Sequence, residues 1–374
     1  MARLGTRTKK FDRFAKWAPG AAVLVLAGFA LLLVAAALST RPVPERASGN
    51  TVASAASALT TGEGTAGEDV GRDTDLKLYD RIAERVGAGE NYYVVAIEEQ
   101  RARDFPVRPG LAVRLPTLAW VSGHVGPWGM MALAFVLGVA VFIAWWDRLE
   151  NEPGGSDYRT YILLLVAIGA LAGFKPHYFA LHEAWAGMFV ALSLGLYRPG
   201  QWGWALVFAA AALAVRELAL PYVCLMGLMA LMRGGRVEAV AWGLLAGLFL
   251  IGLAAHVSLV GALTSTADPV SPGWMALRGL GGWTGNIVAS SPLQLLPAWL
   301  AAPLALLPLI GWAGWRSDLG LTGFLLCIGY GLGFMIFGRD NNFYWALVVM
   351  PVWFVGLAFV PRALSSLWAS ASGQ

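Results

Sequence analysis

Long runs of apolar residues recur along this chain, and their length limits what it can fold into more than any other feature. The first run extends from Ala18 to Ser39, and about 20 apolar residues are enough to cross a bilayer as a helix. Hydrophobic residues make up 57% of the sequence and charged residues only 13%, whereas soluble domains carry about 25% charged residues. These properties exclude an ordinary cytosolic enzyme and predict an all-α polytopic membrane protein.

A basic N-terminal segment, residues 1–17, precedes the first apolar run and carries six Lys or Arg residues. The run itself, 18–39, is longer than the apolar core of a signal peptide, so we interpret it as a first membrane span. Further spans are predicted at 126–146, 160–174, 183–197, 202–218, 220–232, 238–260, 292–313, 319–337 and 343–360. Several are short or interrupted by Gly or Pro, so we expect about 10 transmembrane helices within a range of about 9–11.

Basic residues separate by membrane side in this topology. Thirteen lie on the side of the N-terminus and four on the far side, outside one long loop. Positive charge is enriched in cytoplasmic loops, so we expect both termini in the cytoplasm, with a tail at 361–374. Arg outnumbers Lys by 22 to five, a usage associated with GC-rich bacterial genomes. We therefore expect a multi-pass protein of a bacterial cytoplasmic (inner) membrane.

The first extracytoplasmic loop is the largest polar segment and has two parts. Residues 40–72 are rich in Ala, Ser, Thr and Gly, which predicts a flexible linker. Residues 73–115 open with apolar side chains at helical spacing, which predicts an amphipathic juxtamembrane helix lying on the membrane surface and ending at 87–89. A second helix is expected at about 92–103. The remaining spans occupy 116–360, so the chain, 1–374, is expected to be a single transmembrane domain.

Short motifs follow one another in the outer loops. They are Asp-Leu-Lys-Leu-Tyr at 75–79, Gly-Glu-Asn-Tyr-Tyr at 89–93, Phe-Pro-Val-Arg-Pro at 105–109, Arg-Leu-Pro-Thr-Leu at 114–118 and an Arg/Tyr loop at 338–344. Their order resembles that of the GT-C superfamily of integral-membrane glycosyltransferases. The first motif has a single Asp where many members show an acidic pair. The chain would be a small, transmembrane-only member with a GT-C-like fold.

The resemblance implies transfer of a hexose or pentose from a polyprenyl-phosphate-linked donor to a hydroxyl of a cell-envelope glycan, lipid or protein. The reaction would be inverting and would take place on the periplasmic, extracytoplasmic face. The implied partners are the polyprenyl-phosphate-sugar lipid, a glycan or lipid acceptor and the membrane, without nucleic acid. Independently of the family, unusual polar residues gather on the predicted non-cytoplasmic side. The sequence has no P-loop motif, which argues against an ATP-driven pump.

Asp75 is the expected catalytic base, because a carboxylate within about 3 Å can take the proton of an acceptor hydroxyl. Helix capping is the alternative role for Asp75, and Asp73 fits either role. The leaving lipid phosphate needs Arg, Lys or a metal to hold its charge. The residues expected to bind the donor phosphate or other parts of the substrate are Lys175, His177, Glu183, Arg114, Arg339, Arg216, Glu217, Tyr92 and Tyr93.

Several of these residues also have purely structural interpretations. Lys175 could snorkel to the interface, and the two Tyr could belong to an interfacial aromatic belt. Arg216 and Glu217 lie about 21 Å along a predicted span, where insertion of a charge costs roughly 2.5–3.5 kcal/mol. Helix neighbours point about 100° apart, so we expect these two residues to contact other groups rather than each other. Those groups are a substrate in a wet cavity or the partners of two interhelical ion pairs.

Metal dependence is left open by the sequence. A divalent ion, Mg²⁺ or Mn²⁺, would take Asp75 and Glu183 as its ligands. The alternative function is a secondary transporter or a flippase for lipid-linked sugar, and a non-catalytic assembly subunit is a third possibility. The sugar, the polyprenol length and the oligomeric state do not follow from the sequence.

Overall fold

The computed structural model describes residues 11–39, 74–171 and 175–373. These residues form helices joined by turns and contain no β-strand, which confirms the all-α fold class. The predicted linker 40–72, Asp73 and residues 1–10 lie outside the described residues. Contacts divide the chain into two compact units, and each unit is described by itself.

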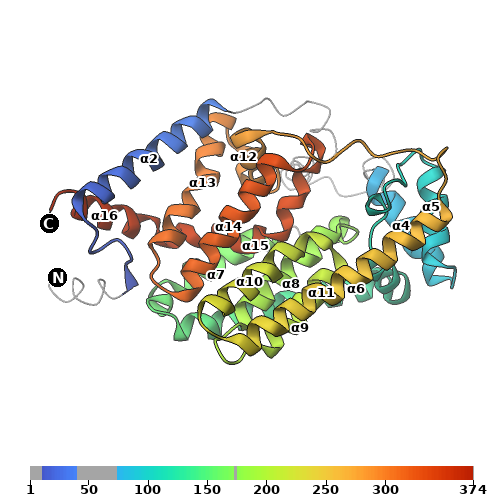
Figure 1. The fold of residues 1–374 in the computed structure, drawn as a ribbon, viewed down its shortest axis with the longest axis horizontal. Coiled ribbons are helices and arrows are strands. Elements are labelled where there is room, and N and C mark those ends of the chain that lie inside the picture. Colours follow the sequence, from blue (N-terminus) through green and yellow to red (C-terminus); the bar gives the residue numbers. More distant parts are fainter. Residues whose placement is uncertain (1–10, 40–73, 172–174, 374) are drawn as a thin grey trace. The chain divides into compact units, whose positions relative to one another are not determined.

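Unit 1 comprises the described parts of 1–47, 141–170 and 275–374. Its first helix, α2 (Pro19–Leu38), coincides with the predicted first span and packs against α13 and α16 (Figure 1). The other elements are α7 (Gly155–Ala170), α12 (Gly279–Ala289), η7 (Pro292–Leu295), α13 (Ala298–Gly314), α14 (Asp318–Ile336), η8 (Asp340–Val348), α15 (Met350–Trp353), η9 (Phe354–Phe359) and α16 (Val360–Ala371), where η denotes a 3₁₀-helix.

The C-terminal part of unit 1 differs from the predicted span at 343–360. The chain there alternates between 3₁₀ and α turns, and α16 then continues through most of the predicted tail. Ala363 and Leu367 of α16 are buried in a cluster with Phe14 and Ala22. An apolar stripe on the predicted tail therefore folds back against α2, which explains why the helix does not end at residue 360.

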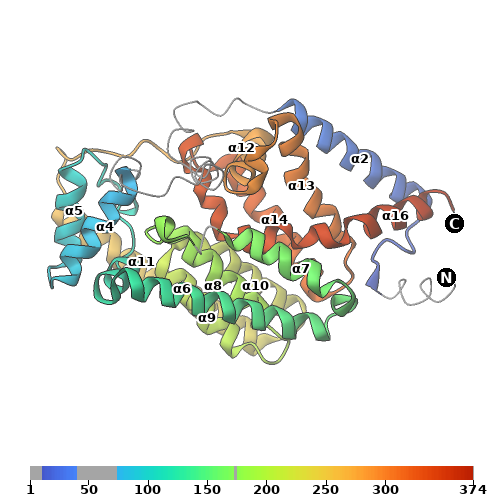
Figure 2. The same ribbon diagram turned by 180° about the vertical axis from the view of Figure 1, so that it is seen from behind.

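Unit 2 comprises the described parts of 48–140 and 171–274. Helix α8 packs against α9, and α10 packs against α11, in a layer that Figure 2 shows from behind. The elements are α4 (Thr74–Gly87), α5 (Tyr92–Arg101), η3 (Gly110–Ala112), η5 (Pro176–Tyr178), α8 (His182–Leu196), α9 (Gly203–Val215), η6 (Glu217–Ala219), α10 (Leu220–Met232) and α11 (Arg236–Leu263). The boundary between the units falls within α6 (Thr117–Asn151).

Two breaks in helical geometry coincide with predicted spans. Gly126, the first residue of the predicted span 126–146, has φ +65° and is followed by Pro127, which lacks an amide hydrogen. Helix α6 already begins at Thr117, so the break lies within this helix and at the start of the predicted span. In the predicted span 202–218, which was expected to be continuous, α9 ends at Val215 because Arg216 is extended, with φ −153° and ψ 123°. Irregular backbone at membrane depth is tolerated where it is buried in protein or lines a cavity.

The two helices predicted in the long loop are present as α4 and α5. The apolar side of α4 that the helical spacing predicted is buried. Leu78 falls outside that spacing and is buried as well. These side chains form a core with Val95, Ile97 and Val113. The apolar side of α4 is therefore covered by protein, whereas the sequence analysis expected it to lie on the membrane.

Within the described residues, five helices are long and apolar enough to cross a membrane. They are Pro19–Leu38, Gly110–Asn151, Arg236–Leu263, Asp318–Ile336 and Met350–Ala371. Three shorter apolar helices, Gly203–Val215, Glu217–Met232 and Ala298–Gly314, fall below that length. The chain thus has the character of a multi-pass membrane protein, while the count of ten spans and the sidedness stay predictions.

Candidate functional site

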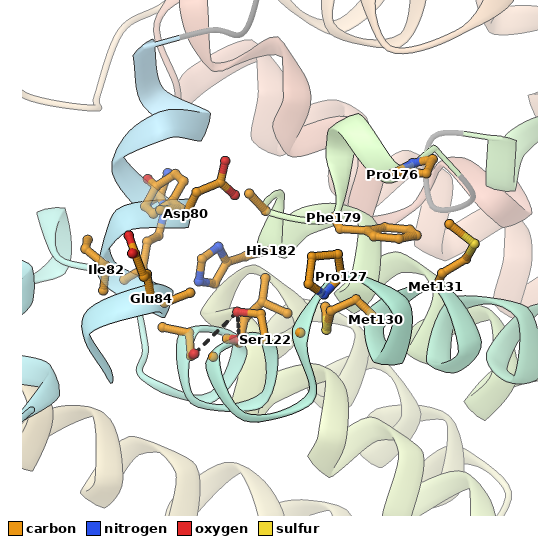
Figure 3. A pocket seen from close by; sticks show the side chains of 18 of the residues that line it. Asp80, Ile82, Glu84, Ser122, Pro127, Met130, Met131, Pro176, Phe179 and His182 are labelled. Carbon is orange, nitrogen blue, oxygen red and sulfur yellow. Dashed lines mark hydrogen bonds between the residues drawn. The ribbon is translucent and has the colours of Figure 1, made fainter. Parts of the chain in front are cut away.

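A cavity of about 800 Å³ lies in unit 2 between α4, the first half of α6 and the segment that leads into α8. Figure 3 shows Asp80 and Glu84 on the α4 side, and Met131 and Phe179 toward the opposite end. The cavity therefore combines a polar end with an apolar end. Its volume lies within the range of about 300–1,000 Å³ that is usual for small-molecule sites.

Ion pairs fix α4, which carries the two cavity carboxylates, to α5. Arg85 donates to Glu90 and Glu98 on the surface and to Glu99 at 2.9 Å. The hydrogen bonds that Arg85 donates, to Glu90 first and then to Glu98 and Glu99, raise the pKa of Arg85. Arg103 also donates to Glu99. These ion pairs hold α4 against α5, and α4 carries Asp80 and Glu84 on the side that lines the cavity.

A glycine contact brings α4 directly against α6. A Cβ atom on Gly87 would lie 2.3 Å from the carbonyl oxygen of Gly123, and one on Gly123 would lie 2.3 Å from that of Ala83. Only glycine allows the two backbones to come this close. This crossing places the carboxylates of α4 opposite Ser122 and Pro127 across the cavity.

His182 is the most unusual side chain of the cavity. It is 3% exposed, and neither ring nitrogen has a hydrogen-bond partner within the described residues. Its ring meets the edge of Tyr79 from α4, with the ring centroids 5.3 Å apart. Buried polar groups are normally paired, and each exception asks for an explanation. A ligand that supplies a donor or an acceptor to His182 would provide one.

Arg114 is the cationic residue of the cavity. The hydroxyl of Tyr92, which also lines the cavity, donates to the Arg114 carbonyl at 2.5 Å. The Arg114 guanidinium approaches Glu183, with Nη2 3.9 Å from Oε1. Burial raises the pKa of Tyr92, so its hydroxyl stays protonated at neutral pH. Two residues predicted from the sequence, Tyr92 and Arg114, are thus brought together in one cavity.

The buried charges behind the cavity form ion pairs. Arg216 donates from Nε to Glu183 at 2.7 Å and from Nη1 to Glu217. The expectation that Arg216 and Glu217 would not contact each other is wrong, because Arg216 has left the helix and the 100° separation no longer applies. Glu183 and Arg216 are each 2% exposed at the side chain. Glu183 does not line the cavity. Its ion pair with Arg216 matches one of the two alternatives in the sequence analysis, namely interhelical ion pairs.

Other predicted residues lie beside the cavity or apart from it. Lys175 and His177 flank Pro176, which lines the cavity, and both are partly exposed. Tyr93 turns toward α11, where its hydroxyl lies 3.3 Å from Nδ1 of His256. Asp75 is the second residue of α4, and its side chain lies outside the described part of the structure.

Arg339 belongs to unit 1, where it precedes η8. Its backbone amide donates to Asn342 at 3.0 Å. Nearby, Arg278 at the start of α12 donates to Asp340 and to Asn286, both at 3.0 Å. Three buried donors here have no partner among the residues that the structure describes, namely Arg339 Nε, Arg278 Nη1 and Asn286 Nδ2. Arg339 therefore lies in a donor-rich part of unit 1, and its role toward phosphate stays a prediction.

Among the cavity-lining side chains that were not predicted as substrate contacts, Asp80, Glu84 and His182 carry a carboxylate or an imidazole. The two carboxylates are four residues apart and so share a helix face, but the sequence pattern showed only a solvated side. The described residues contain no cluster of three or more His, Cys, Asp or Glu side chains suited to a metal. The Glu183 carboxylate, a predicted metal ligand, is engaged by Arg216.

Comparison with known proteins gives no relative: no family model, no curated protein and no solved structure matches the chain.

Proposed function

We propose that the chain is an integral-membrane glycosyltransferase that moves a sugar from a polyprenyl-phosphate-linked donor to a hydroxyl acceptor on the extracytoplasmic face. The observation that carries this proposal is the cavity of unit 2, where carboxylates, a cation and an unpartnered imidazole meet an apolar wall. A substrate that joins a sugar phosphate to a long hydrocarbon requires this combination of polar and apolar surface. The motif order from residue 75 to residue 118 supports the same class.

The chemistry assigns one task to each end of the cavity. The acceptor oxygen attacks the anomeric carbon of the sugar, and the bond from that carbon to the phosphate oxygen breaks. The phosphate oxygen leaves with the bonding electron pair, so polyprenyl phosphate is released with inversion at carbon. Arg114 and His182 hold the phosphate, and a carboxylate of α4 accepts the proton from the attacking hydroxyl.

Two carboxylates of α4 are candidates for that base. Asp75 is favoured by the resemblance, and Asp80 is favoured by its place in the cavity. Removing a general base slows a reaction by about 10²–10⁴-fold. We therefore expect either Asp75→Asn or Asp80→Asn to abolish transfer while the folded protein persists in the membrane.

The test compares lipids and envelope glycans of a deletion strain complemented with matched amounts of each protein. The variants are Asp75→Asn, Asp80→Asn and, as a matched control, Asp157→Asn at the exposed start of α7. Mass spectrometry should show one polyprenyl-phosphate sugar accumulating, and one glycan losing that sugar, in the deletion and in the base variant. Asp157→Asn should restore the wild-type profile. Full rescue by both Asn variants would contradict the transferase proposal.

A transporter is the second candidate, because the break at Gly126 and Pro127 resembles the discontinuous helices of transporters. Sidedness separates the two functions. Loss of a transferase leaves the lipid-linked sugar in the outer leaflet, where membrane-impermeant periodate oxidises it in intact spheroplasts. Loss of a flippase leaves the sugar in the inner leaflet and protected, which would favour the transporter.

A further inference from the structure

A second cavity, of about 470 Å³, lies in unit 1 between α2, α13 and α14. Arg13 stands at the end where α2 begins, and every other side chain of the lining is apolar. Trp17, Phe29 and Leu32 are contributed from the α2 side, and Ile310 and Phe324 from the two facing helices. Large side chains elsewhere on α2, such as Leu24 and Leu31, are at least 70% exposed. The groove therefore opens on a helix whose surface is suited to lipid.

Arg13 is held at the end of this groove by the backbone. Its amide donates to the Gly314 carbonyl at 2.9 Å, and its Nη2 donates to the Trp315 carbonyl at 3.2 Å. Its Nε is buried and has no partner within the described residues. Burial first, and then the charge of Arg316, lower the pKa of Arg13, an effect that Asp318 partly offsets. The other nearby acid, Asp12, lies 3.5 Å from Arg362.

We propose that this groove binds an anionic phospholipid, with an acyl chain along α2 and the headgroup phosphate at Arg13. The guanidinium of Arg13 lines the groove, and charge-assisted hydrogen bonds from Arg to phosphate are the strong ones. Exposed Lys16 and Arg316 add positive charge at the same end. This site is separate from the proposed glycosyltransferase cavity, and neither depends on the other.

The length and side of the groove fit this ligand. Leu32 lies 13 residues beyond Pro19, which is about 20 Å along a helix and more than half of a hydrocarbon core of about 30 Å. A single acyl chain therefore has room to extend through one leaflet. The basic N-terminus predicts that this end faces the cytoplasm, where the leaflet is rich in anionic lipid.

Gly28 provides a way to fill the groove without disturbing the fold. It lines the cavity, and a Cβ atom built on it meets no atom within 4 Å. Gly20, also on α2, has equally open space but does not line the cavity. Gly28→Leu and Gly20→Leu are therefore matched variants, and Arg236→Gln, at the exposed start of α11, is the charge control for Arg13→Gln.

The experiment is native mass spectrometry of the full chain, stripped of lipid in detergent and titrated with phosphatidylglycerol or phosphatidylcholine of identical acyl chains. Both lipids carry the phosphate, but the choline cation of phosphatidylcholine is repelled by Arg13, Lys16 and Arg316, so the wild type should bind phosphatidylglycerol about tenfold more tightly. Arg13→Gln should remove that preference, and Gly28→Leu should weaken both lipids about tenfold. Gly20→Leu and Arg236→Gln should behave as wild type, and melting temperatures in lipid-free detergent should confirm that every variant is folded.

Several results would overturn the proposal. Equal binding of the two lipids by the wild type would remove the role of Arg13. Unchanged binding in Gly28→Leu would mean that lipid binds outside the groove. Full competition by inorganic phosphate alone would show a simple anion site in which the acyl chain has no part.

Discussion

At the scale of single residues, the buried imidazole of His182 lowers stability and would be useful only for binding a ligand. Its ring is buried with both nitrogens unpartnered, although a polar group without a partner costs about 1–3 kcal/mol. A protein retains such a group where a ligand completes its hydrogen bonds. The unpaired ring nitrogens would then lower the stability of the protein without ligand, and their hydrogen bonds to the ligand would raise its affinity.

We expect His182→Phe to raise the free energy of unfolding by about 1–3 kcal/mol in the absence of substrate, because it removes an unpaired polar group. The substitution keeps the edge contact with Tyr79. The same variant should fail to restore the glycan in the deletion strain. Equilibrium unfolding in detergent and the complementation assay measure the two effects. A less stable variant that keeps full activity would assign His182 a structural role.

Asp268 is a second residue whose role only the structure reveals. It lies in the polar loop after α11, where its carboxylate accepts from Arg101 at 2.6 and 2.7 Å. It also accepts from the Ser265 amide at 2.6 Å. The hydrogen bond from Arg101 first, and then that from Ser265, hold the pKa of Asp268 below its usual range. The loop after α11 is thereby tied to the end of α5.

This lowered pKa predicts a pH-dependent contribution to stability. A carboxylate with a lowered folded-state pKa contributes fully above its unfolded pKa of about 3.9, and the contribution declines as the pH falls toward the folded value. We expect Asp268→Asn to have a lower melting temperature than the wild type at pH 7. The difference between the two melting temperatures should become smaller below about pH 4. Melting curves of both proteins from pH 7 to pH 3 measure it. A gap that stays constant with pH would exclude the ion pair as its cause.

At the scale of elements, the crossing of α4 over α6 decides where the cavity carboxylates stand. The sequence indicated that α4 ends near Gly87, and the residue was read only as a helix terminus. In the structure Gly87 is also a close-packing position against Gly123. Periodicity within one helix carries no information about such a contact, because the two glycines are 36 residues apart.

We expect Gly123→Ala to push α4 away from α6, because its Cβ would lie 2.3 Å from the Ala83 carbonyl oxygen. Overpacking of this kind costs about 1–3 kcal/mol, and transfer should fall along with stability. Gly243→Ala in α11 is the control, since its Cβ meets no atom within 4 Å. Melting temperature and complementation measure both variants. Similar behaviour of the two would show that the crossing tolerates a side chain.

At the scale of the whole molecule, the membrane topology decides which side of the membrane each proposed site faces. In the part of the chain that the structure describes, five helices meet the length and hydropathy of spans. The predicted total of about ten requires the shorter apolar helices to cross as well. Broken helices are tolerated at membrane depth where their polar groups find protein partners. The ion pair of Arg216 with Glu183 supplies such partners at one break.

The topology predicts opposite sides for two exposed positions. In a background without Cys224 and Cys327, Thr266→Cys should react with a membrane-impermeant maleimide in intact cells. Ser156→Cys should react only after permeabilisation, because five predicted spans separate the two positions. Labelling on the same side would require an even number of spans between them. Inverted labelling would place the N-terminus outside.

The sequence by itself determined the all-α fold class and the positions of the long apolar helices, because hydropathy and the 3.6-residue period are local properties. It identified α2, α4, α5, α11 and α14 closely, but it did not predict α12, and it placed most of α16 in a tail. It also named Tyr92 and Arg114, which the structure brings together in one cavity. Only the tertiary structure decided how the buried charges pair, where α6 and α9 break, and which carboxylates face the cavity. Those features depend on contacts such as that of Glu183 with Arg216, 33 residues apart, which no pattern within one segment can encode.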